Sequence, residues 1–150
     1  MKVGVLFPTG FESPGELLAD ARALEAADVD SIWIEDDAGE LDAWLILAAI
    51  AATTSHVRLG VLPRSPLDKT TTHERRVETL QRLSRNRVVG SGERWQEVKV
   101  PADRAAWATT LQQDRPGVDG LIVPHDPRLL DMLRNPDEEI DRSDLALAQG

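Results

Sequence analysis

Three short stretches of the sequence carry side chains that could do chemistry. Glu35, Asp36 and Asp37 form an acidic run, whose carboxylates could accept hydrogen bonds from a polar ring or coordinate a hard divalent cation. His125 stands beside Asp126, a pair that could supply a general base or a metal ligand. The run Ser91–Glu93 contains a glycine that permits close approach of the backbone to a ring or a phosphate.

Each stretch also has an alternative interpretation without chemistry. The acidic run could be a solvated loop that caps the next helix, and Asp126 could be a helix N-cap beside a surface histidine. A lone Gly-Ser-Gly sequence is equally typical of a plain turn. Trp95 could stack on a cofactor ring or simply pack against its neighbours. The sequence leaves these alternatives open and assigns no catalytic residue.

Regular alternation of strands and helices is expected to position these residues. Apolar runs predict strands, and Ser, Thr or Asp caps followed by helical spacing of apolar residues predict helices. The predicted strands are Val3–Phe7, Ser31–Glu35, Val57–Leu62, Arg87–Ser91 and Val118–Pro124, and the connection Glu93–Pro101 could hold an extra edge strand. The predicted helices begin at Ser13, Asp42, Thr71 and Ala102, and Asp126 and Pro127 open a last one.

This alternation predicts an α/β fold with a parallel sheet and right-handed crossovers. A parallel barrel takes eight strands, so about five βα units predict a truncated TIM-barrel-like sheet. We expect residues 1–150 to form a single domain, with residues 134–150 as a polar surface tail. Ligands of such sheets bind beyond the carboxyl ends of the strands, where Pro63 and Trp95 are also expected.

Composition excludes several classes of partner and chemistry. The formal charge of -9 disfavours nucleic acids and anionic membranes, because both attract basic proteins. No apolar run is long enough to span a bilayer and no signal peptide is evident, which predicts a cytoplasmic protein. The chain has no cysteine, so redox chemistry would have to come from a bound cofactor.

Three pieces of the chain resemble the luciferase-like monooxygenase family when read together. They are LEAADVDSIWIEDD from Leu24, LILAAIAATTSHVRLGVL from Leu45, and VETLQRLSRNRVVGSGERW from Val77. The resemblance implies a barrel oxidoreductase that uses reduced flavin mononucleotide or a deazaflavin of the F-420 type. It also implies that the cofactor would be bound by Glu35, Asp36, Pro63, Ser91, Gly92, Trp95 and His125.

The chain departs from the family pattern at several positions. Asp36 stands where the family usually has a histidine, Lys69 and Thr70 replace a histidine-proline pair, and Arg85 and Asn86 replace a glycine pair. These changes support an alternative, a non-catalytic oligomeric or ligand-binding homologue that binds no cofactor because it has lost the phosphate site. A third hypothesis is a metal-dependent enzyme that uses the acidic run with His125.

The sequence also predicts a homodimer or a larger oligomer. The helix segment from Ala43 to Ala52 is apolar nearly all round, which is more than one sheet-facing stripe requires. An open parallel sheet moreover has two unpaired edges that invite association. We expect Ile46 and Ile50 on the outer face of this helix, in contact with a second copy across a two-fold axis.

Overall fold

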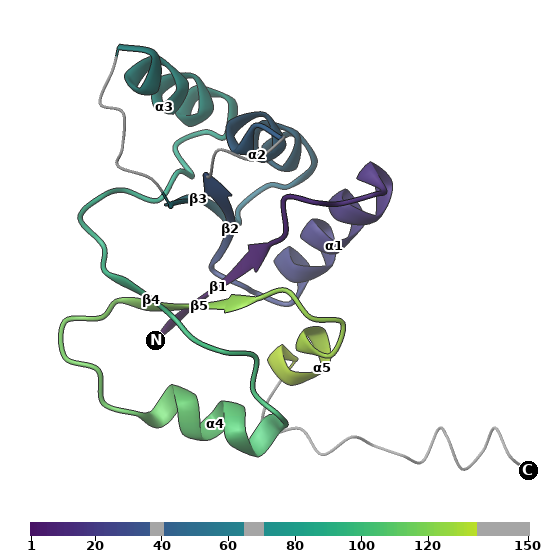
Figure 1. Ribbon diagram of the computed structural model, residues 1–150, viewed down its shortest axis with the longest axis vertical. Coiled ribbons are helices and arrows are strands. Elements are labelled where there is room, and N and C mark those ends of the chain that lie inside the picture. The colour runs from purple at the N-terminus through teal and green to yellow at the C-terminus, as the bar shows by residue number, and fades with distance from the viewer. Residues whose placement is uncertain (37–40, 65–70, 135–150) are drawn as a thin grey trace, which may run out of the picture.

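Strands and helices alternate along the chain in the computed structural model, which describes residues 1–36, 41–64 and 71–134 (Figure 1). The strands are β1 (Lys2–Phe7), β2 (Ser31–Asp36), β3 (Arg58–Pro63), β4 (Trp95–Glu97) and β5 (Gly120–Pro124). The helices are α1 (Pro14–Ala26), α2 (Ala43–Thr53), α3 (Thr71–Leu83), α4 (Arg104–Gln112) and α5 (Leu129–Leu133). The predicted α/β class is confirmed.

Short polar side chains begin three of the helices, as their positions in the sequence predict. The Ser13 hydroxyl accepts a hydrogen bond from the Glu16 amide before α1, and Pro14 is the first helical residue. The Asp42 carboxylate accepts from the first amides of α2, and Asp103 does the same for α4. These caps fix where each helix starts relative to the strand before it.

All five strands are parallel and pair in the order β3-β2-β1-β5-β4. The first strand is therefore central, with β2 on one side and β5 on the other. In a flat sheet, β3 and β4 would lie about 19 Å apart, at about 4.8 Å per strand spacing. Yet Arg64 after β3 forms an ion pair with Glu97 of β4. The sheet is therefore curled into a half-barrel, which confirms the TIM-barrel-like prediction.

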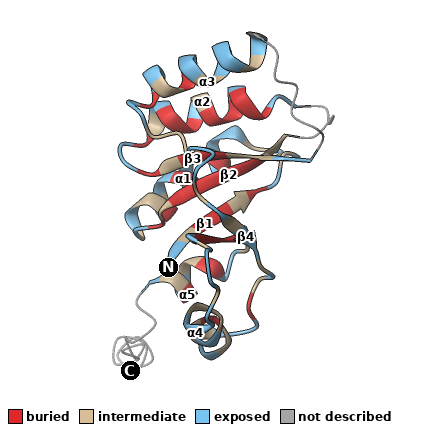
Figure 2. Ribbon diagram, turned by 90° about the vertical axis from the view of Figure 1, so that its left-hand side faces the viewer, coloured by how far each residue is buried: buried red, intermediate tan, exposed pale blue. Residues whose placement is uncertain are grey.

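The helices lie around the outside of this curled sheet (Figures 1 and 2). Alternate strand residues such as Val5, Phe7, Ile32, Ile34 and Val123 face the helices and are almost fully buried. The other set of alternate residues faces the interior of the half-barrel, because successive side chains of a strand point to opposite faces. Most of the apolar core therefore lies between the sheet and the helices, and a different set of side chains fills the interior of the half-barrel.

The prediction of a strand at Arg87–Ser91 is wrong. Only Val88 makes a bridge there, with Leu59 of β3, and the chain then turns at Ser91 and Gly92. The strand that completes the sheet is β4, which lies in the following segment and pairs with β5 from Gly120 onward. A valine pair is apolar enough to favour a strand, but the glycines and the turn end the pairing after one bridge.

The expected outer face of α2 is also wrong in its details. Ile46 and Ile50 are 8% and 0% exposed, so they pack inward, whereas Leu45 is 71% exposed. Ala49 and Ala52 follow Leu45 on the exposed side. The helix does present an apolar outer row, one residue out of register with the predicted one. Among the described helices, none has the length and apolarity that crossing a bilayer requires.

Candidate functional site

An ion bridge crosses the carboxyl edge of the half-barrel. The Arg64 guanidinium, just beyond β3, donates to Glu35 of β2 through Nε at 3.1 Å, and to Glu97 of β4 through Nη1 and Nη2 at 2.9 and 2.6 Å. The hydrogen bonds from Arg64 lower the pKa of the Glu97 carboxyl, and in turn Glu97 and Glu35 raise the pKa of Arg64. Both carboxylates are therefore already paired with Arg64, and neither is free to act as a base.

Two tryptophans fill the interior beneath this bridge. The rings of Trp33 in β2 and Trp95 in β4 lie 5.1 Å apart, centre to centre. Each ring lies against strands that carry no side chain at that point, because Gly4 and Gly60 face Trp33 and Gly120 faces Trp95. A Cβ at any of these glycines would overlap an indole. The glycines thus make the room that the two indoles occupy.

The two indoles differ in how their nitrogens are satisfied. Trp33 Nε1 donates to the Ser31 hydroxyl at 2.8 Å, which orients its ring. Trp95 Nε1 is buried and meets no acceptor among the described residues. Trp95 also lies under the Arg58 guanidinium, whose carbon is 6.0 Å from the ring centre. Trp95 is therefore an interior packing residue at the start of a strand, in a different place from the predicted loop.

A second ionic cluster closes the amino-terminal end of the half-barrel. Arg58, the first residue of β3, donates to Glu93 at 2.6 and 3.0 Å and to Asp30 at 2.9 Å, and Lys2 of β1 adds a 3.2 Å contact to Glu93. The hydrogen bonds from Arg58 lower the pKa of the Glu93 carboxyl to about 2, against the opposing effect of burial. Ser91 and Gly92 precede this carboxylate in the chain and are exposed. They therefore lie beside the amino-terminal cluster, at the opposite edge from Glu35.

His125 faces the helices instead of the interior. Its ring packs edge-on against Phe7 at 4.9 Å, and its Nε2 lies 3.6 Å from Asp20 of α1. The neighbouring Asp126 has a lowered pKa because Arg128 donates to its carboxylate, and it caps the turn before α5. The prediction that Asp126 is the N-cap of the last helix is wrong, because α5 begins at Leu129 with Arg128 at its N-cap position and without a side-chain cap.

The seven residues predicted to bind a cofactor are thus spread over four places. Asp36 and Pro63 end paired strands next to Glu35 at the carboxyl edge, and the Asp36 carbonyl accepts from the Arg64 amide at 3.2 Å. Trp95 is interior, Ser91 and Gly92 lie at the other edge, and His125 faces the helices. That they bind a cofactor stays a prediction, but they do not line one cavity. Arg64 and Glu97, which organise the carboxyl edge, were missed, because the connection Glu93–Pro101 was expected at most to hold an extra edge strand and its pairing with the rest of the sheet was not predicted.

In the described part of the chain, the residues of the metal hypothesis do not come together as a set of ligands for one ion. His125 lies on the opposite face of the sheet from Glu35, and Glu35 is paired with Arg64. Asp37 lies outside the described residues. Residues 1–36, 41–64 and 71–134 contain no group of three acidic or histidine side chains that could hold one metal ion.

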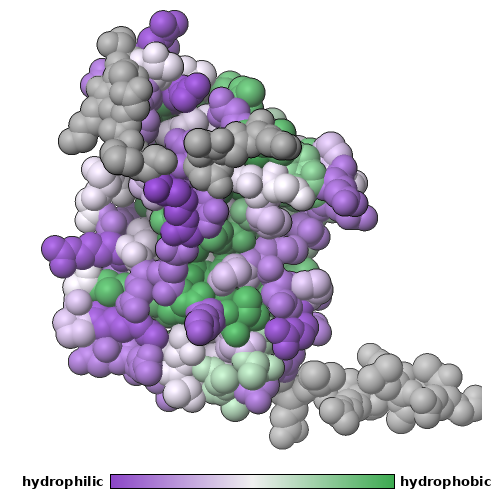
Figure 3. Space-filling view, viewed as in Figure 1, coloured by the Kyte–Doolittle hydropathy of each residue, from purple (hydrophilic) through white to green (hydrophobic). Residues whose placement is uncertain are grey.

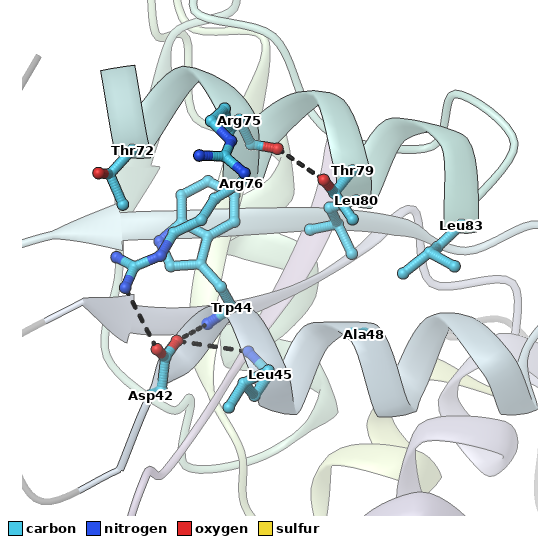
Figure 4. Close-up of a pocket in the computed structure, with 10 residues that line it drawn as sticks. All are labelled: Asp42, Trp44, Leu45, Ala48, Thr72, Arg75, Arg76, Thr79, Leu80 and Leu83. Carbon is cyan, nitrogen blue, oxygen red and sulfur yellow. Dashed lines mark hydrogen bonds and ion pairs between the residues drawn. The ribbon is translucent and has the colours of Figure 1, made fainter. Parts of the chain in front are cut away.

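A pocket of about 430 Å³ lies outside the half-barrel, between α2 and α3 (Figure 4). Apolar side chains and two arginines share its lining. The residues are Asp42, Trp44, Leu45, Ala48, Thr72, Arg75, Arg76, Thr79, Leu80 and Leu83. None of the seven predicted cofactor residues is among them.

The interior residues do not fit a flavin or deazaflavin ring. A planar tricyclic ring placed within the half-barrel would have to displace the Trp33 and Trp95 indoles and open the Arg64 bridge above them. Placed on the bridge, it would meet carboxylates whose acceptor positions are engaged by Arg64. A cofactor site in this interior would therefore need a different arrangement of the same side chains.

A family model described as luciferase-like monooxygenase matches residues 1–113, three quarters of the 150-residue chain. The match includes β1 to β4 and all of the Arg64 bridge. A search of curated proteins finds no significant match.

Proposed function

Because the chain belongs to the luciferase-like monooxygenase family, an oxidoreductase family, we propose a specific departure from it: a non-catalytic, self-associating domain that holds no flavin or deazaflavin in its half-barrel. The observation that carries this proposal is the Arg64 bridge over the Trp33 and Trp95 rings. Arg64 is already hydrogen-bonded to the two carboxylates, and the two indole rings already pack against each other, where a cofactor ring would have to lie. The departures of the sequence from the family pattern favour the same alternative. We take residues 1–150 to form this one domain.

Flavin mononucleotide and a deazaflavin of the F-420 type provide the direct test. We expect the purified protein to carry no visible flavin absorbance, and equilibrium dialysis to show no binding of either compound up to millimolar concentration. Stoichiometric binding that Glu35→Gln or Ser91→Ala weakens would refute the proposal and restore the oxidoreductase hypothesis. Glu12→Gln, at an exposed residue far from these groups in the sequence, is the matched control for Glu35→Gln.

The proposed partner is a second copy of the chain, which would cover the outer row of α2. The row consists of Leu45, Ala49 and Ala52, with Leu45 71% exposed, and Leu41, just before the helix, is 43% exposed. Figure 3 shows hydrophobic surface at the upper right, where Figure 1 places α2. An apolar row that self-associates across a two-fold axis would remove these side chains from water.

A further inference from the structure

We propose that the pocket between α2 and α3 binds an amphipathic organic anion, namely a carboxylate with an apolar chain or ring. This site lies outside the half-barrel, so the proposal goes beyond the proposed function and does not depend on the flavin test. Its volume of about 430 Å³ is in the range of small-molecule sites, which is about 300–1,000 Å³. The argument rests on three features of its lining.

The first feature is the guanidinium of Arg75. The Arg75 guanidinium makes no hydrogen bond or ion pair within the described residues, and only its backbone carbonyl is engaged, by the Thr79 hydroxyl at 2.7 Å. On a chain with a formal charge of -9, an arginine at the wall of a pocket that pairs with no described residue favours an anion there. A carboxylate can take two parallel hydrogen bonds from one guanidinium.

The second feature is that the acid already in the pocket is occupied elsewhere. Asp42 caps α2, accepting from the Trp44 amide at 2.9 Å and the Leu45 amide at 3.4 Å. The same carboxylate lies 3.6 Å from the Arg76 guanidinium (Figure 4). Asp42 therefore neutralises at most one of the two arginines, and the lining keeps a net positive charge.

The third feature is an apolar wall. Trp44 is 8% exposed, and its Nε1 is buried without an acceptor among the described residues. Figure 4 shows its indole between the two helices, beside the side chain of Arg76. Ala48 and Leu80 continue the wall, and Leu45 and Leu83 are 71% and 60% exposed at its margin. A ligand with an apolar body would cover Ala48 and Leu83, whereas Leu45 belongs both to this margin and to the outer row of α2.

Octanoate is the probe that combines both properties. Isothermal titration of the full chain should show that octanoate binds, that acetate does not, and that 1-octanol binds at least about tenfold more weakly because it lacks the charge. Arg75→Gln should weaken octanoate binding about tenfold and leave 1-octanol binding unchanged. Arg82→Gln is the matched control, since Arg82 lies on the same helix, outside the pocket, in an exposed pair with Glu78.

Three results would overturn the proposal. No octanoate binding up to millimolar concentration would show that the pocket takes no such anion, whether it is open or covered by a second copy. Equal binding of octanoate and octanol would mean that the site recognises only apolar surface. An equal effect of Arg75→Gln and Arg82→Gln would mean that the overall charge, and not the pocket, attracts the anion. Arg75 is exposed, so both variants should fold, which circular dichroism checks.

Discussion

Glu93→Gln should destabilise the fold at neutral pH, because Glu93 joins three segments at the amino-terminal end of the half-barrel. Its carboxylate accepts two hydrogen bonds from Arg58 of β3 and one from Lys2 of β1, and it stands two residues before β4. Glutamine keeps the size of the side chain and removes its charge. The variant therefore tests the ionic closure and leaves the packing almost unchanged.

The size of the effect follows from the pKa of the Glu93 carboxyl. The hydrogen bonds from Arg58 lower this pKa from 4.5 to about 2. That difference corresponds to at most about 3 kcal/mol of stabilisation at neutral pH. The side chain is 25% exposed, and solvent screening reduces such contributions, so we expect Glu93→Gln to cost about 1–2 kcal/mol.

The pH dependence gives the prediction its sign. The carboxyl has a lower pKa in the folded chain than in the unfolded chain, so its contribution is complete above 4.5 and is lost as pH falls toward about 2. Urea unfolding should therefore show that the wild-type chain has a higher free energy of unfolding than Glu93→Gln at neutral pH. This difference between the two proteins should narrow as the pH falls over this range. An equal stability at neutral pH, or a gap that persists in acid, would refute the reasoning. Glu12→Gln, at an exposed residue, should show no gap.

Three further predictions concern packing, buried hydrogen bonds and association. Gly60→Ala should lower the midpoint of thermal unfolding far more than Gly10→Ala, because a Cβ at the first position overlaps a tryptophan ring and at the second meets nothing within 4 Å. Arg87→Met should lower the free energy of unfolding in urea by about 1–3 kcal/mol. The Arg87 guanidinium donates to three backbone carbonyls between the end of α2 and the start of β3, and to the Ser84 carbonyl in the turn after α3. A loss no larger than that for an average surface arginine would contradict this prediction. Light scattering behind a sizing column should give twice the 16.5 kDa chain mass, and Ala49→Glu should reduce it whereas Ala105→Glu on α4 should not; a wild-type mass of one chain would exclude the dimer.

The fold was largely predictable because local signals carry it. The strands at Lys2–Phe7, Ser31–Asp36, Arg58–Pro63 and Gly120–Pro124 are apolar runs, and they differ from the prediction by no more than two residues at each end. Strand β4 was not predictable in the same way. The sequence Trp-Gln-Glu is short and polar, and it forms a strand only because β5 offers it a partner at Gly120.

The placement of His125 could have been predicted by counting along its strand. Leu121, Val123 and His125 are two residues apart and so share a face, and a strand that buries Val123 against helices points His125 the same way. The Arg64 bridge had no such signal. Arg64 and Glu97 are 33 residues apart and meet only because the sheet curls, and the curl is a property of the whole sheet.

The curl and a cofactor would compete for the same side chains in this half-barrel. In an eight-stranded barrel, hydrogen bonds between neighbouring strands hold every strand in place. Here β3 and β4 are brought together by Arg64 with Glu97 at one edge and Arg58 with Glu93 at the other. Trp33 and Trp95 pack between these two ion pairs, from β2 and β4. A ring that entered between the tryptophans would break contacts that hold the sheet curled, so its binding energy would first have to exceed theirs. The physical consequence is that any variant that frees this interior for a ligand should also lower the stability of the fold.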